Sequence, residues 1–91
     1  MRICLDTFTS EGRKLRKIIN LPFVPVKGTE MILLVSGVHH RFHAYQVSIC
    51  ELPGKDNWQY VIYLETFPQE NTSQLPDPPP KFDTDPTWNT I

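Results

Sequence analysis

All three histidines of the chain, His39, His40 and His43, lie in one short stretch, VHHRFHAY. Imidazole is a common metal ligand and general base, so this stretch is the first candidate for chemistry. In a β-strand, which rises about 3.3 Å per residue, His39 and His43 lie roughly 13 Å apart, and adjacent side chains point to opposite faces. One zinc ion needs its nitrogen ligands within about 2.1 Å. We therefore expect ordinary strand histidines and no metal site.

Catalytic motifs are not indicated elsewhere either. A nucleophile needs a base within hydrogen-bond reach, and only Ser36 and Ser48 lie near the histidines in the sequence. The four glycines are too far apart for a phosphate-binding loop. Cys4 and Cys50 do not have metal-site spacing, and each lies in an apolar context typical of a buried, reduced thiol. We expect a protein that is not an enzyme and holds no cofactor.

A basic run, RKLRK, contributes Arg13, Lys14, Arg16 and Lys17. Together with Arg41 these cations are candidates for binding a nucleic-acid backbone. A solvated hairpin tip, or a dock for an acidic protein segment such as the chain's own tail, would use the same residues. The net charge of −1 and the pI near 6.3 are less basic than is usual for nucleic-acid-binding domains. Nucleic-acid binding is therefore the alternative hypothesis.

The elements that must position these residues are β-strands. Apolar and polar residues alternate with a period of two, turn residues separate the runs, and no helical period competes. A connector at residues 21–28 carries Pro22 and Pro25, which remove backbone donors and disfavour a central strand. The expected strands cover residues 2–8, 14–21, 30–36, 38–52 and 58–67, with a tight turn at Ser36-Gly37.

These strands predict an all-β fold, a small five-stranded antiparallel barrel of the SH3-like or OB-like sort. In the long fourth strand, Phe42 and Tyr45 have opposite parity although both are apolar. Keeping the apolar side inward requires one inserted residue, so we predict a β-bulge between them. The core is expected to contain Leu5, Ile19, Leu33, Val47, Ile62 and Leu64.

The last 24 residues differ in composition, which predicts two regions: a barrel domain at 1–67 and a Pro-rich acidic tail at 68–91. The tail holds six of the nine prolines and four acids against one lysine, so in isolation it should be extended or disordered. Its PDPPPK stretch has the PxxPxK form of polyproline ligands, although a solvated spacer is the simpler interpretation. Phe82, Trp88 and Ile91 stand singly, as chance residues or as anchors for a surface.

The function expected from these features is a non-enzymatic protein-binding module. Val61, Tyr63 and Phe67 give the last strand an apolar outer face, which the tail, a second copy or a foreign partner would cover. Tyr63, Phe67, Phe82 and Trp88 are the predicted partner-binding residues. The chain lacks an apolar run long enough for a membrane span or a signal peptide, so we expect a cytoplasmic protein with no membrane partner.

The stretch LPFVPVKG, followed by two apolar strands and YVIYLE, resembles small uncharacterised barrel proteins of bacteria and their mobile elements. The similarity is one of pattern and covers residues 21–65. It implies a small barrel, and it carries no functional residues that transfer to this chain.

Overall fold

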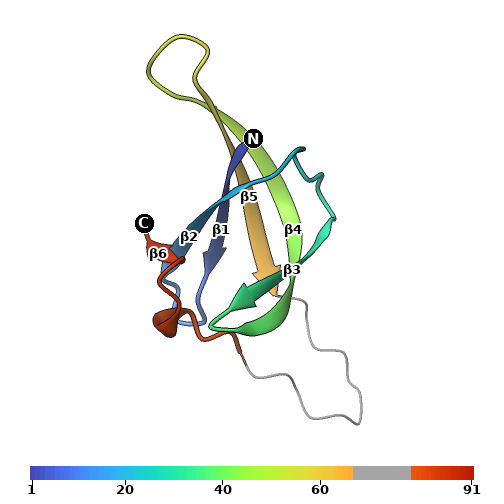
Figure 1. The fold of residues 1–91 in the computed structure, drawn as a ribbon, viewed down its shortest axis with the longest axis vertical. Helices are drawn as coiled ribbons and strands as arrows, with labels where there is room; N and C mark the ends of the chain where they lie inside the picture. Colours follow the sequence, from blue (N-terminus) through green and yellow to red (C-terminus); the bar gives the residue numbers. More distant parts are fainter. Residues whose placement is uncertain (67–78) are drawn as a thin grey trace.

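The computed structural model describes residues 1–66 and 79–91, which form one curled β-sheet (Figure 1). The helical content of this part is a single 3-10 turn, η1 (Phe82–Thr84), and no helix in it is long and apolar enough to cross a membrane. The strands are β1 (Arg2–Phe8), β2 (Lys14–Asn20), β3 (Glu30–Val35), β4 (Val38–Glu51), β5 (Trp58–Thr66) and β6 (Asn89–Thr90).

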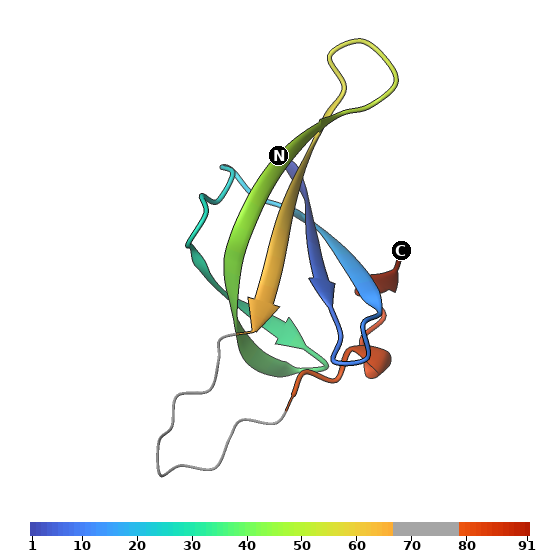
Figure 2. The ribbon, with the colours of Figure 1, turned by 180° about the vertical axis from the view of Figure 1, so that it is seen from behind.

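The strand order in the sheet is β3-β4-β5-β1-β2-β6, so β3 and β6 are its two edges. All neighbouring strands are antiparallel except β1 and β5, which are parallel. The expectation of a five-stranded, wholly antiparallel barrel is wrong in both details. Each of the four connections from β1 to β5 reverses the chain, so β1 and β5 run in the same direction and can pair only as a parallel ladder. The sheet curls into a half-barrel (Figures 1 and 2).

The predicted bulge in the long strand is confirmed. Ala44 pairs with Leu64, and the next β4 residue in register is Gln46, opposite Tyr63. Tyr45 is therefore the inserted residue. The insertion lets Phe42 and Ala44 on one side of it, and Val47 on the other, face the same core.

The core lies on the concave side of the sheet. Of the six residues expected there, Leu5, Ile62 and Leu64 are buried, whereas Ile19, Leu33 and Val47 are partly buried and pack against the others. Phe42 is fully buried at the centre. The two thiols differ: Cys4 is buried as expected, but Cys50, near the end of β4, is exposed.

The C-terminal residues 79–91, which we call the C-terminal clasp, pack against the sheet. The clasp runs past the turns at one end of the sheet and adds β6 to the edge of β2 (Figure 1). Trp88 is part of the hydrophobic core. The expectation of an extended or disordered tail is therefore not confirmed for these residues, because aromatic burial offsets the entropy lost on ordering. The predicted domain boundary at residue 67 lies outside the described residues.

The β3–β4 hairpin has a two-residue turn at Ser36-Gly37, as predicted. Both residues have positive φ, 50° and 80°, which is the type I′ geometry that matches the twist of a β-hairpin. Glycine adopts this conformation without cost, but serine does not. The clasp contacts Ser36 at this strained position, as described below.

Candidate functional site

The clasp holds the turns of both hairpins at one end of the sheet. Asp83 pairs with Arg13 beside the β1–β2 turn. On the β3–β4 turn, the Ser36 amide donates to Oδ2 of Asp85 at 2.9 Å, and the Ser36 hydroxyl donates to the carbonyl of Lys81 at 2.7 Å. Since β2 and β3 lie on opposite sides of the curl, the clasp joins them and closes the half-barrel at this end.

Three aromatic rings fill the space beneath the clasp. Trp88 stacks edge-on against Phe82, with ring centroids 5.1 Å apart, and both rings lie 6.4 Å from Phe42. The Nζ atom of Lys17 lies 5.8 Å from the Trp88 ring, in cation–π geometry. Phe82 and Trp88, predicted as anchors for a partner, therefore anchor the chain's own C-terminus. For Trp88 this is a correction, because it is buried in the core and offers no surface to a separate protein.

The carboxylate of Asp85 should make the stability of the clasp sensitive to acid. Hydrogen bonds from the Thr87 hydroxyl, and then from the Ser36 and Thr87 amides, lower the pKa of Asp85 below its ordinary value. A lowered folded-state pKa stabilises the fold above the unfolded-state value of about 3.9, and this contribution is lost as the pH falls through the folded value. We expect the parent to be more stable than Asp85→Asn at pH 6, with the difference shrinking as the pH falls below about 4.

Urea unfolding at each pH, followed by circular dichroism, measures this difference. Glu30→Gln is a positive control for the urea measurement. Hydrogen bonds from Arg41 also lower the pKa of Glu30, so its contribution to stability should depend on pH in the same direction, although Glu30 lies outside the clasp. In a Trp58→Phe background, Trp88 is the only tryptophan that fluoresces. As the pH falls and the stability contributed by Asp85 is lost, its emission should shift to the red in the parent but not in Asp85→Asn. A stability difference that is constant with pH contradicts the prediction.

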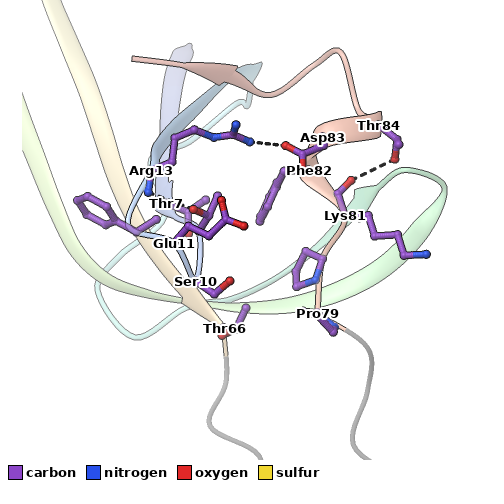
Figure 3. A pocket seen from close by; sticks show the side chains of 13 residues that line it. Thr7, Ser10, Glu11, Arg13, Thr66, Pro79, Lys81, Phe82, Asp83 and Thr84 are labelled. Atoms are coloured by element: carbon purple, nitrogen blue, oxygen red, sulfur yellow. Dashed lines mark hydrogen bonds and ion pairs between the residues drawn. The ribbon is translucent and has the colours of Figure 1, made fainter.

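A groove of about 550 Å³ lies between the β1–β2 turn and the start of the clasp (Figure 3). Its lining carries hydroxyls and charges of both signs, among them Glu11, Arg13 and Asp83, with Arg13 and Asp83 paired across it. Among the described residues that line it there is no histidine or cysteine to act as base or nucleophile.

A carboxylate, that of Asp6, is buried on the outer face of the sheet. Asp6 is only 1% exposed, and Arg16 donates to both of its oxygens at 2.7 and 2.9 Å. These hydrogen bonds raise the pKa of the Arg16 guanidinium above its ordinary value. Lys14 lies 3.8 Å from Asp6 and 5.9 Å from the ring of Tyr63. Tyr63 is half-buried and packs against Tyr45, with ring centroids 6.2 Å apart. The last predicted anchor, Phe67, lies outside the described residues.

The five cations proposed for nucleic acid all have partners within the chain. Arg13 contacts Asp83, Lys14 and Arg16 contact Asp6, Lys17 lies over Trp88, and Arg41 donates to both carboxylate oxygens of Glu30. Phosphate binding would have to compete with these contacts. Three interpretations of the basic run were possible. Arg13 and Lys17 fit the one in which the run docks the chain's own tail, because both contact residues of the clasp.

The histidines all lie on β4. His39 is exposed, His40 is half-buried opposite Leu33, and Nδ1 of His43 lies 3.2 Å from Oε1 of Glu65. In residues 1–66 and 79–91 no three histidine, cysteine or acidic side chains gather closely enough to hold a metal ion.

The free edge of β3 is the surface that sequence reasoning missed. Among the described residues β3 pairs only with β4. Ile32 and Leu34 project from its outer face and are 58% and 49% exposed. Beside the edge lies an apolar groove of about 320 Å³ between the end of β2, the connector and β3. It is lined by Ile19, Leu21, Phe23, Pro25, Thr29, Glu30, Met31, Ile32 and Leu33.

Natural proteins protect an edge strand with lysine, proline, an inward charge or a bulge. The sequence of β3, EMILLV, contains none of these between Met31 and Val35. The signal was present in the sequence, since this run is apolar on both faces whereas a strand covered on one face alternates. Among residues 1–66 and 79–91 the half-barrel is therefore closed by the clasp at one end, and no strand or charge covers the apolar edge of β3.

Comparison with known proteins found no family model, no curated protein and no solved structure that matches this chain.

Proposed function

We propose that this chain is a non-enzymatic protein-binding module that contacts its partner through the free edge of β3. The observation that carries the proposal is an edge strand that no other described strand covers, with exposed Ile32 and Leu34 beside an apolar groove. Such an edge offers a row of unpaired backbone groups for hydrogen bonds, and the flanking side chains supply apolar contact area. This surface replaces the one predicted from the tail and β5, because Phe82 and Trp88 pack into the protein's own core.

The alternative, nucleic-acid binding, has less support because each of its five cations contacts an acidic or aromatic side chain of the same chain. We also propose that the half-barrel is related in architecture to SH3-like or OB-like barrels. In this proposal the clasp closes part of the barrel, as a fifth antiparallel strand does in those folds. The cytoplasmic location and the bacterial or mobile-element origin stay predictions.

Photo-crosslinking in native cells tests the proposed surface. A benzophenone amino acid at position 34 should give an adduct with protein, whereas the same group at position 49 should not, because Ile49 is exposed but lies far from β3 along β4. Adding Ile32→Lys should reduce the adduct at least tenfold, which corresponds to about 1.4 kcal/mol of lost affinity. Equal adducts at positions 34 and 49, or none at position 34, would contradict the proposal.

A further inference from the structure

We infer that the partner at this edge is a second copy of the chain, joined by antiparallel pairing of β3 with β3. The inference rests on the proposed function and names the occupant of its surface. The backbone geometry, the side-chain stripe and the charges at the two ends of β3 each favour this arrangement.

The backbone groups of β3 that face the free edge can be assigned from the hairpin. In a two-residue hairpin the residues flanking the turn, here Val35 and Val38, form a hydrogen-bonded pair, and such pairs alternate along an antiparallel ladder. Val35, Leu33 and Met31 therefore bond to β4. The N–H and C=O groups of Ile32 and Leu34 point away from β4, toward the free edge.

These two residues are also complementary to themselves. Around a twofold axis at Leu33, Ile32 of one copy lies opposite Leu34 of the other, and their backbone groups form two hydrogen-bonded pairs. The side chains of both residues lie on the outer face, where the two copies together form one apolar stripe. An isologous contact needs this self-complementarity, since one patch must serve as both surfaces.

The charges at the ends of β3 agree with the antiparallel direction. Glu30 stands at the start of the strand, and the pKa lowered by its hydrogen bonds from Arg41 keeps its carboxylate charged. At the other end, the carbonyl of Lys81 accepts the Ser36 hydroxyl, so the clasp places Lys81 beside the β3–β4 turn, and in Figure 3 its side chain extends away from the groove. In the proposed register Glu30 lies opposite Ser36 of the second copy, so Glu30 and Lys81 attract each other at both ends of the interface.

The opposite edge gives a contrast within the same sheet. On β2 the neighbouring strand is β6, and the side chains of Lys14, Arg16 and Lys17 follow one another along β2. Both devices discourage pairing with another chain. In the part of the chain that the structure describes, one edge of the sheet is thus covered and charged, and the other is apolar and has no further strand beside it.

Analytical ultracentrifugation of the full chain from about 1 to 500 μM tests the inference. We expect a reversible monomer–dimer equilibrium, weakened at least tenfold by Ile32→Lys and unchanged by Ile49→Lys, its control of the same type and of similar exposure, 56% against 58%. Glu30→Lys and Lys81→Glu should each weaken the dimer, and the double charge reversal should restore it. This rescue distinguishes the pairing from general stickiness of the edge.

A chain that stays monomeric over this range, a dimer insensitive to Ile32→Lys, or charge reversals without rescue would each overturn the inference. The proposed function fails separately. If the chain is monomeric but the crosslink at position 34 still joins it to a different protein, the edge is a binding surface and only its occupant is wrong.

Discussion

Phe42→Ala should remove a large part of the stability of this protein. Phe42 is fully buried and contacts the rings of both Phe82 and Trp88, so truncation removes apolar burial and opens a cavity where the sheet and the clasp meet. Such substitutions cost about 3–5 kcal/mol, and domains of this size are stable by only about 5–15 kcal/mol. In urea we expect the unfolding midpoint to fall by roughly 2 M with an unchanged slope.

Phe8→Ala is the matched control, because Phe8 also lies on a strand but is 56% exposed. It should change the free energy of unfolding by less than about 1 kcal/mol, the usual range for surface substitutions. Equal losses in the two variants would mean that Phe42 does not occupy the centre of the core. A changed slope for Phe42→Ala would instead indicate that the clasp separates before the sheet unfolds.

Much of the sheet could be predicted because its determinants are local. Alternation fixes which residues of a strand face inward, and the type I′ turn at Ser36-Gly37 fixes the register of β3 with β4. The bulge at Tyr45 followed from one break in parity along a single strand. In each case the wrong arrangement would turn an apolar side chain toward water, and a few neighbouring residues are enough to show this.

The long-range features were not predicted for physical reasons. Nothing in the sequence near Asp6 shows that Arg16, ten residues later, will cover it on the outer face of the sheet. The contact of Trp88 with Phe42 joins residues 46 positions apart, and composition alone cannot separate a segment that is disordered in isolation from one that docks on its own domain. The candidate site combines a local and a long-range feature in the same way. The sequence shows that Ile32 and Leu34 belong to an apolar strand, but whether the edge of that strand is covered depends on the rest of the sheet.

Trp88→Ala should both destabilise the fold and release the clasp. The indole contributes its packing against Phe42 and Phe82 and its contact with Lys17, and no described group accepts a hydrogen bond from its Nε1. Truncating a buried tryptophan costs about 3–5 kcal/mol. Hydrogen exchange measured by mass spectrometry should show the amide of Ile91, which donates to the carbonyl of Lys14, exchanging at least tenfold faster.

Trp88→Phe separates aromatic packing from any other role of this residue. Because the indole N–H has no acceptor among the described protein groups, phenylalanine loses no such hydrogen bond and leaves a smaller cavity. We expect it to cost less than Trp88→Ala, because the phenyl ring keeps part of the aromatic packing and fills part of the cavity. The pattern that supports a clasp held by aromatic burial is slow exchange at Ile91 in Trp88→Phe and fast exchange in Trp88→Ala, with the clasp exchanging faster than β1 in the alanine variant. If Trp88→Ala unfolds at the same urea concentration as the parent and keeps Ile91 protected, Trp88 does not hold the half-barrel closed.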